Sequence, residues 1–560
     1  MAFTPTDMQV FKHIDPLVDL RGKSEWVVES SGKFFRYQAI PAQSQQSTTM
    51  TWNVICPEGP QTIIHPQIWV RANCHFSFTG VGNPLLQIDQ GNDAVRWCPL
   101  NSSAESVRVT FQNTSFQSMP KRSLHAMARC YLNQEAIKRN LGPLQWDTTQ
   151  EYSQATGTVG QNPLCSWIDS TQYFQGRGAQ NYQNLVNGNG TASCDLVTIE
   201  PLFLSPLTSL MSTPDGVLSS GWDHQGIMGI QNFSVVMALT GSFSDGSTSW
   251  SHSSSGNTLS TISVTIDTPE LIVCFITRQD TMEIPRSLSL PYYDYSTPYS
   301  TSLGTVNAGQ TVNAALNAIT LKTIPSHIFI FAQESENSKT VTSTDTFFAI
   351  EQVSLRIGGY SNFLDTATPE QLYDISVQNG YCGQWNDWIC ARGFGMGSVL
   401  AIDMVKNLGI PSPTEAPGVG DMGTLTLNAN IRFRNGNQAR NINATAWLVP
   451  VYAGVFTIFP KDLQTFQSLS IVSKEQVLSS PVIPQLQVLP SKRVFGGKIG
   501  SKELLRGVER AYSIGRKGLK EVSSIAKDLQ PIASLAMPLL KGGKGVSKKT
   551  LKDRLAQLEM

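Results

Sequence analysis

Short segments in which apolar and polar residues alternate recur along most of the first 465 residues. Residues 261–267 and 424–433 alternate regularly, which is typical of strands that bury one face. Other segments are runs of β-branched and aromatic residues bounded by Gly, Asn, Ser, Pro and Asp, and they also predict strands. These further segments are residues 67–72, 106–112, 270–277, 326–332, 347–357 and 445–452.

Helical patterns are few, and the connections between the predicted strands are long and polar. We expect one helix around 124–141 and another over 368–379, where Thr368-Pro-Glu resembles a helix start. Residues 289–310 separate two strand-rich halves, and the Ser-rich segment 244–257 is expected to be an exposed loop. The pattern therefore predicts sandwiches or jelly rolls.

Length and composition narrow the class of protein. The 560 residues exceed what one hydrophobic core usually organises, so at least two cores are expected. Charged residues make up only 15%, which excludes a charge-rich disordered chain. No apolar run approaches the roughly 20 residues of a membrane helix, and the start Met1-Ala-Phe-Thr-Pro lacks the features of a signal peptide. The nine cysteines include no Cys-x-x-Cys pair, which favours reduced thiols.

The net charge of zero hides an asymmetry along the chain. Residues 491–560 hold 16 Lys and Arg against 6 Asp and Glu, whereas the other 490 residues hold 26 against 36. All 11 Trp and all nine Cys lie in that larger part. A mildly acidic, aromatic-rich body is thus followed by a basic tail, which suggests a polyanionic partner for the tail.

The body shows no convincing catalytic or metal-binding pattern. Cys74 and His75 are neighbours on a predicted strand and should point to opposite faces, so a shared metal is not expected. Asp223-His224 lacks an accompanying nucleophile motif. The Gly-rich segment Gly393-Phe-Gly-Met-Gly397 is interpreted as a turn, because residues 399–407 fit a strand as well as the helix that a nucleotide site needs. We therefore predict no enzyme activity and no cofactor.

An ordered set of segments between residues 343 and 459 resembles a known family. It comprises Thr344-Asp-Thr-Phe-Phe-Ala-Ile-Glu, Thr366-Ala-Thr-Pro-Glu-Gln-Leu-Tyr, Trp385-Asn-Asp-Trp, the segment 397–410 and a final pair of strands. Upstream, Pro291-Tyr-Tyr-Asp-Tyr and Ile324-Pro-Ser-His-Ile-Phe add to it. The succession is similar to the second half of the double jelly-roll major capsid proteins of Polinton-like, adintovirus-type and virophage elements, which are distantly similar to adenoviral hexon.

The resemblance implies an all-β fold of two tandem eight-stranded jelly rolls with long loops, few short helices and a basic, partly helical C-terminal tail. The expected divisions are an N-terminal arm at 1–30, jelly rolls at 31–290 and 291–465, a linker at 466–497 and the tail at 498–560. Three chains would form a pseudo-hexagonal capsomer that tiles an icosahedral shell. The alternative is a β-sandwich protein that binds a receptor or carbohydrate, such as a spike or fibre.

The resemblance also implies partners and a location. The homotrimer would contact neighbouring capsomers and the penton and minor capsid proteins. The protein would be part of the virion, after assembly inside the host cell in the cytoplasm or nucleus.

Two Gly-Gly segments in the tail resemble recognition sites of adenovirus-type cysteine maturation proteases, which cut after the second Gly. The first combines Val494 with Gly496 and Gly497, and the second combines Leu540 with Gly542 and Gly543. A Gly-Gly segment can lie extended in a narrow protease groove. The alternative is that each is only a flexible linker.

Between the two Gly-Gly segments, apolar residues recur at helical spacing and basic residues accompany them. Such a weak basic helix could contact genomic DNA, lie on a membrane or dock on the inner side of the capsid. The strongly basic end of the chain favours DNA. The candidate polyanion contacts are Arg506, Arg510, Arg516, Lys517, Lys520, Lys544, Lys548 and Lys549.

Overall fold

The computed structural model describes most of the predicted body. The described residues are 35–45, 48–82, 85–88, 93–130, 168–169, 172–173, 183–205, 207, 226–252, 257–276, 287–357, 360–393, 395–409 and 425–469. Every strand pairing among these residues is antiparallel, as jelly rolls require. In this part of the chain no helix is both long and apolar enough to cross a membrane.

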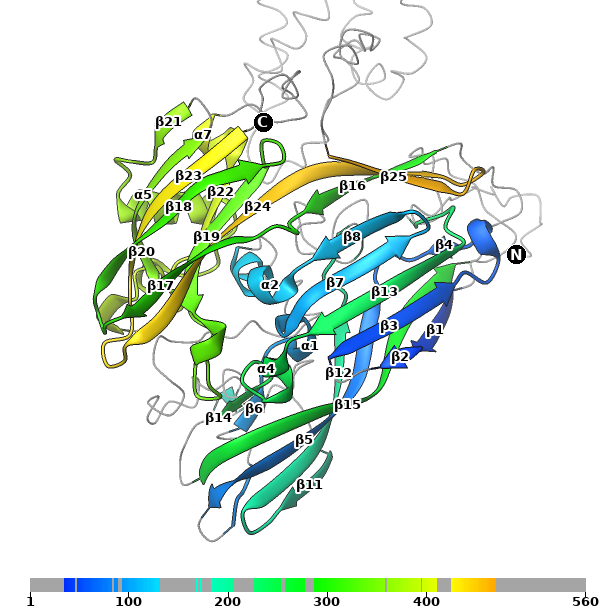
Figure 1. Ribbon diagram of the computed structural model, residues 1–560, viewed down its shortest axis with the longest axis horizontal. Coiled ribbons are helices and arrows are strands. Elements are labelled where there is room, and N and C mark those ends of the chain that lie inside the picture. Colours follow the sequence, from blue (N-terminus) through cyan, green and yellow to red (C-terminus); the bar gives the residue numbers. More distant parts are fainter. Residues whose placement is uncertain are drawn as a thin grey trace, which may run out of the picture. The chain divides into compact units, whose positions relative to one another are not determined.

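The first half of the described chain folds into a sandwich of two larger sheets (Figure 1). One sheet has the order β1 (Phe35–Pro41), β15 (Asn257–Ile276), β5 (Trp69–Gly82), β12 (Thr191–Pro201) and β11 (Gln183–Asn187), with β4 (Ile63–Ile64) on β15. The other has the order β2 (Ser44–Gln45), β3 (Thr49–Ile55), β13 (Asn232–Leu239), β7 (Ala104–Phe111) and β8 (Thr114–Ser118). Two small sheets pair β6 (Asp93–Val95) with β14 (Trp250–His252) and β9 (Ile168–Asp169) with β10 (Gln172–Tyr173).

The second half forms another sandwich. One sheet has the order β16 (Leu288–Asp294), β24 (Ile442–Phe459), β19 (His327–Glu334) and β22 (Leu400–Asp403), with β17 (Tyr299–Val306) and β25 (Gln464–Leu469) also on β24. The other has the order β18 (Thr311–Leu321), β23 (Leu425–Arg434), β20 (Ala349–Ile357) and β21 (Tyr360–Phe363). The predicted arrangement of two tandem β-sandwiches is therefore present.

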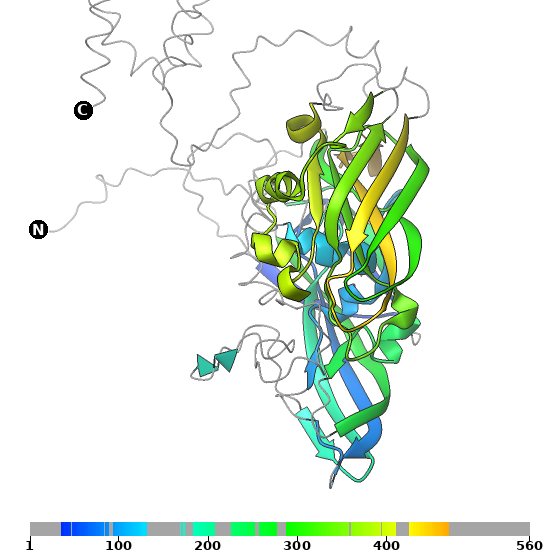
Figure 2. The same cartoon turned by 90° about the vertical axis from the view of Figure 1, so that its left-hand side faces the viewer.

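The helices are short. The first sandwich carries α1 (Pro99–Ser102), α2 (Pro120–Arg129), α4 (Gly241–Ser244) and the 3-10 turn η2 (Gly59–Gln61). The second carries α5 (Pro369–Gln378), α6 (Trp385–Trp388), α7 (Met404–Leu408) and the turns η4 (Glu336–Ser338) and η5 (Ala391–Gly393). Helices α5, α6 and α7 lie together on one side of the second sandwich (Figure 2).

Local sequence explains where α5 begins. Thr368 accepts a hydrogen bond from the Gln371 amide, while the Gln371 side chain accepts one from the Thr368 amide, which completes a capping box. Pro369 occupies the first helical position, where its missing N–H costs nothing. The helix predicted from Thr368-Pro-Glu is thus confirmed.

Several local predictions need correction. The segments expected as two strands around Thr268-Pro269 form one 20-residue strand, β15, whose pairing with β5 shifts between Asp267 and Glu270. That irregularity accommodates the proline, which has no N–H for the ladder. At residues 399–407, where the sequence left strand and helix open, the chain forms the short strand β22 and then begins α7. The helix expected around 124–141 starts earlier, at Pro120, and residues 131–141 lie outside the described part.

The prediction of an exposed loop over 244–257 is wrong at residues 246–252, which are buried, and residues 253–256 lie outside the described part. Trp250 is fully buried, with its ring 4.8 Å from those of Phe76 and Phe78. Strand β14, which contains Trp250, pairs with β6. The Ser and Gly composition suggested exposure, but the indole packs against two phenyl rings, and Ser249 and Ser251 beside it are buried as well.

Candidate functional site

Strand β24 belongs to both sandwiches, and the seam between them is the most elaborate feature of the described chain. The first part of β24 pairs with β17 and β19, for example Leu448 with Tyr299. Its last part pairs with β16 and β25. The strand is 18 residues long, so one continuous backbone connects the two cores.

At the end of β24, apolar side chains of the second sandwich enter the core of the first sandwich. Phe456 is fully buried in the core of the first sandwich. Its ring lies 5.6 Å from that of Phe111 and 4.9 Å from that of Phe116, the latter edge to face. Ile458 on β24 and Tyr292 on β16 lie in the same core, although both strands belong to a sheet of the second sandwich. The first core is therefore completed by residues from the end of the fold.

Strand β25 adds buried hydrogen bonds to these contacts. The Thr465 hydroxyl donates to the Phe111 carbonyl at 3.0 Å and lies 2.8 Å from the Thr114 hydroxyl. The Thr465 amide donates to Asn113 Oδ1 at 3.1 Å, and the Thr114 hydroxyl is 2.8 Å from the Thr465 carbonyl. Since each satisfied buried hydrogen bond contributes about 0.5–1.5 kcal/mol, the set anchors β25 on the β7–β8 turn.

Helix α2 follows strands of the first sandwich along the chain but packs into the core of the second sandwich. Leu124 and Met127, on its apolar face, belong to the core of the second sandwich. At its C-terminal end, the Arg129 carbonyl accepts a hydrogen bond from the Cys382 amide at 2.9 Å, and the Arg129 guanidinium contacts the Met396 sulfur. Each sandwich therefore supplies part of the other's core.

A buried ion pair joins the two halves as well. Arg96 Nη1 donates to Asp345 Oδ2 at 3.0 Å, and both side chains are almost fully buried. The same guanidinium donates to the carbonyls of Trp250, Thr340 and Ser343 at 2.8, 3.1 and 2.7 Å. Burial by itself raises the pKa of Asp345, but Lys339 and Arg96 outweigh it and hold that pKa well below its usual value.

Next to this pair lies a second buried cluster. The Asp93 carboxylate accepts a hydrogen bond from Trp250 Nε1 at 3.2 Å and lies 2.9 Å from His252 Nδ1. Asp93 on β6 is thereby connected to both Trp250 and His252 on β14. The cluster holds the Trp250 indole in place in the core of the first sandwich.

Glu200 is a buried carboxyl group with a structural task. It accepts hydrogen bonds from the amides of Leu100 and Asn101, both at 2.9 Å, and from Asn101 Nδ2 at 2.7 Å. These amides lie in the first turn of α1, where the N-cap residue Cys98 provides no side-chain hydrogen bond. Burial raises the pKa of Glu200 to about 7, although the hydrogen bonds from Asn101 and Leu100 oppose the rise.

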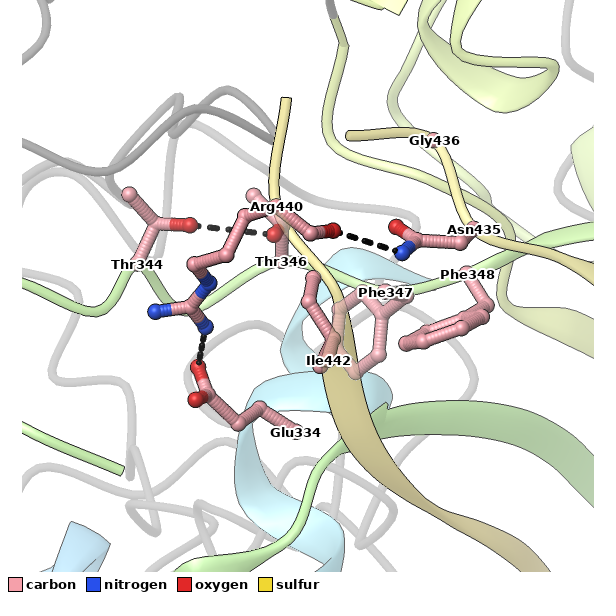
Figure 3. A pocket seen from close by; sticks show the side chains of 9 residues that line it. All are labelled: Glu334, Thr344, Thr346, Phe347, Phe348, Asn435, Gly436, Arg440 and Ile442. Atoms are coloured by element: carbon pink, nitrogen blue, oxygen red, sulfur yellow. Dashed lines mark hydrogen bonds and ion pairs between the residues drawn. The ribbon is translucent and has the colours of Figure 1, made fainter. Parts of the chain in front are cut away.

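Two cavities among the described residues are smaller than a ligand site. The first, shown in Figure 3, is a polar notch of about 20 Å³, bounded by the 2.5 Å ion pair between Arg440 and Glu334 and by Phe347 and Ile442. It holds about one water molecule. It is therefore not a site for a metabolite, which needs about 300 Å³ or more.

The second cavity, of about 100 Å³, lies at the seam between α2 and β24. Lys121, paired with Glu336, and Trp447 line it, and the Arg122 guanidinium lies 5.4 Å from the Trp447 ring centre. Burial lowers the pKa of Lys121 to about 8, and burial is also the main reason that the pKa of His125 falls to about 4. Neither cavity suits a cofactor, and the described residues contain no group of three metal-ligating side chains.

The outward face of the β1–β15–β5–β12 sheet carries polar and charged pairs as well as exposed apolar side chains. His75 and Asp195 lie 2.6 Å apart across β5 and β12, and Asn184 also donates to Asp195, at 2.6 Å. The hydrogen bonds from Asn184 and then His75 lower the pKa of Asp195. Cys74 is buried on the other face, as the sequence predicted. Exposed apolar residues on strands of this sheet are Phe35, Tyr37, Val81, Leu185, Val186, Val197 and Ile199.

The structure does not reach the residues that the sequence singled out as sites. The candidate cleavage residues from Val494 to Gly543 and the candidate polyanion contacts from Arg506 to Lys549 lie outside the described residues, as does Asp223-His224. In the Gly393–Gly397 segment, Gly393 ends η5, Phe394 lies outside the described residues, and Gly395–Gly397 is neither helix nor strand. A Cβ on Gly397 would lie 1.9 Å from the Phe347 carbonyl oxygen, so the backbones approach closely there.

The seam residues were missed by sequence reasoning. Arg96 and Asp345 are 249 positions apart, so no local spacing connects them. The available signal was indirect: Asp93 and Arg96 flank the apolar Ala94-Val95, and charged residues are almost never fully buried unless they are paired.

Two protein-family models match the chain. The Sputnik virophage major capsid protein first domain matches residues 6–276, and the major capsid protein V20 C-terminal domain matches residues 292–454. A curated relative, the putative capsid protein V20 of Sputnik virophage, is 25% identical over 522 residues, which span 86% of this chain and 83% of the relative.

Solved structures agree in fold. A chain of the Sputnik virophage cryo-EM structure has a TM-score of 0.70 at 21% identity, covering 90% of this chain and 99% of that one. The crystal structure of the mavirus major capsid protein gives a TM-score of 0.61 at 12% identity, covering 86% and 96%. Together with the two sandwiches described above, these matches confirm the double jelly-roll fold.

Proposed function

The chain belongs to the virophage-type major capsid proteins, which are structural and not enzymatic, and from that premise we propose that three copies form a pseudo-hexagonal capsomer of an icosahedral shell. The observation that carries the proposal is the reciprocal exchange of core residues between the two sandwiches. Two sandwiches locked by Phe456 and by α2 make one firm building block. Three such blocks present six sandwiches, the number that a pseudo-hexagon needs.

The apolar residues on the outward sheet face suit contacts between copies. Tyr37 is 73% exposed and Ile199 is 48% exposed on strands of one sheet, and a monomer gains nothing by leaving both in water. Contacts of this kind would join chains within a capsomer and capsomers to one another. Penton and minor capsid proteins would complete the virion, which would assemble within the host cell.

The tail is proposed to be an inward-facing basic element. Its excess of ten positive charges in 70 residues matches a packaged genome, the largest polyanion inside a capsid, and a membrane is the other candidate surface. A maturation cysteine protease would cut after Gly497 and after Gly543. The proposed divisions remain those of the sequence, with an arm at 1–30, jelly rolls at 31–290 and 291–465, a linker at 466–497 and the tail at 498–560.

The capsomer proposal is tested with the full-length protein in solution. Light scattering at micromolar concentration, over a range of salt, should give three times the 61.3 kDa chain mass, and electron micrographs should show compact pseudo-hexagonal particles. A monomer at every salt concentration, or an elongated rod, contradicts it.

The cleavage proposal is tested separately by the intact mass of the protein from mature particles. Chains that end at Gly497 or at Gly543 support it. A full-length mass refutes processing and leaves the capsomer proposal standing.

A further inference from the structure

The C-terminal end of α2 brings two cysteines from different sandwiches together. Cys130 follows α2 directly, and Cys382 lies between α5 and α6. Both are present as thiols. They are 252 positions apart, so only the docking of α2 on the second sandwich makes them neighbours.

Backbone geometry limits the distance between these two residues. The Cys382 amide donates to the carbonyl of Arg129, the residue bonded to Cys130, at 2.9 Å. Adding the N–Cα bond of Cys382 and the span from a carbonyl oxygen to the next Cα leaves the two Cα atoms no more than about 7 Å apart. Disulfides join Cα atoms that are about 4.4–6.8 Å apart, and this upper limit lies at the end of that range, so a bridge requires no large movement of the backbone.

The side chains are consistent with the backbone. The Cys130 sulfur lies 3.7 Å from the Val399 carbonyl of the second sandwich, so it points across the seam. Burial raises the pKa of Cys130 well above its usual value, and the Cys382 thiol adds to that rise because the two groups lie close together. Cys390 is also nearby, but its sulfur is directed at the Asp387 carbonyl of its own loop, at 3.9 Å.

We infer that Cys130 and Cys382 are a thiol pair that a small disulfide oxidant converts into a covalent bridge between the two sandwiches. Cys382 is half-buried and Cys130 is buried, so Cys382 reacts first. Its thiolate attacks one sulfur of the oxidant, the oxidant's S–S bond breaks, and one small thiolate leaves and takes up a proton. The Cys130 thiolate then attacks the Cys382 sulfur and expels the second small thiol. Two protein thiols are oxidised and one small disulfide is reduced to two thiols.

The bridge would respond to the surroundings of the particle. Cytosolic thiol pools keep such a pair reduced, whereas oxidising surroundings outside the cell favour the disulfide. The closed loop would be long, and the constraint on the unfolded chain grows with loop length. Oxidation would therefore tighten the seam after assembly without any change in fold.

The test uses the full-length protein treated with oxidised glutathione, denatured, alkylated with iodoacetamide and digested. We expect a peptide containing Cys130 joined to one containing Cys382, which separates on reduction. The melting temperature should rise by a few degrees on oxidation of the wild type and of Cys390→Ala, a matched control from the same neighbourhood, but not of Cys382→Ser. Alkylated Cys130 with glutathionylated Cys382, or a bridge from either residue to Cys390, would overturn the inference. Because peptide mapping is done on the wild type, a variant that fails to fold does not prevent a decision.

Discussion

The rings of Phe111 and Phe456 stack across the seam with their centres 5.6 Å apart and their planes inclined by 30°. Phe111 ends strand β7 of the first sandwich, and Phe456 lies near the end of β24. Because β24 is also a ladder strand of the second sandwich, this contact couples the packing of one core to the strand pairing of the other. The double jelly roll should therefore unfold as one unit.

Truncation of Phe456 is the direct test of this coupling. Phe456→Ala should lower the free energy of unfolding by about 3–5 kcal/mol, because it leaves a cavity among Phe111, Phe116 and their neighbours. Val455→Ala, one residue away and 39% exposed, should change it by less than about 1 kcal/mol. Denaturant unfolding measures both. Equal losses, or two separate transitions in the wild type, would argue against a shared core.

The Arg96–Asp345 pair gives a prediction about buried charge. Asp345→Asn should cost about 3–5 kcal/mol of stability, because it leaves a buried guanidinium without its carboxylate. Glu270→Gln removes the partner of the exposed Arg71 and should cost at most about 1 kcal/mol.

The same pair predicts a particular pH dependence. The pKa of Asp345 is held below its unfolded value, so its contribution is present above the unfolded pKa and is lost as pH falls through the folded one. The difference between wild type and Asp345→Asn should therefore stay constant from neutral pH to about pH 4 and shrink only below that. A difference that vanishes near pH 6 would contradict this assignment.

Glu200 predicts the opposite dependence on pH. Its folded pKa of about 7 lies above the usual 4.5, so the folded state binds more protons between these values and stability falls as pH rises through this window. The advantage of wild type over Glu200→Gln should decrease by up to about 3 kcal/mol from pH 4.5 to pH 7. Thermal unfolding of both proteins along a pH series measures the difference. His125 changes stability in the other direction over pH 4 to 6.5, but it is present in both proteins and cancels. A flat difference would mean that Glu200 is ionised throughout.

The basic tail predicts a salt dependence that can be reduced by mutation. Replacing Lys544, Lys548 and Lys549 by Gln should lower the slope of log affinity for duplex DNA against log salt by about 2–3, since each phosphate contact contributes about 0.9. Arg71→Gln removes one exposed charge from the body and should leave the slope unchanged. Fluorescence anisotropy with full-length proteins measures the slope. Unchanged slopes in both proteins would favour a membrane or the capsid itself as the tail's partner.

Much of the fold could be predicted because its information is local. Regular alternation in 424–433 and the Thr368 capping box each act within about ten residues, and both predictions agree with β23 and α5. The burial of Trp250 could not be predicted, because it depends on Phe76, Phe78 and Asp93, all more than 150 positions away. The contacts across the seam could not be predicted for the same reason. Side chains of α2 and β24 enter the core of the other sandwich only once both sandwiches have formed.

The late position of β24 has a consequence during synthesis. A ribosome that adds about 5–20 residues per second needs tens of seconds to travel from Phe111 to Phe456. Throughout that interval the nascent first sandwich lacks the aromatic side chain that closes its core, and its apolar interior is open to other nascent chains on the same polysome. Abundant expression of this protein should therefore depend on host chaperones that hold the N-terminal half until the last strands have been made.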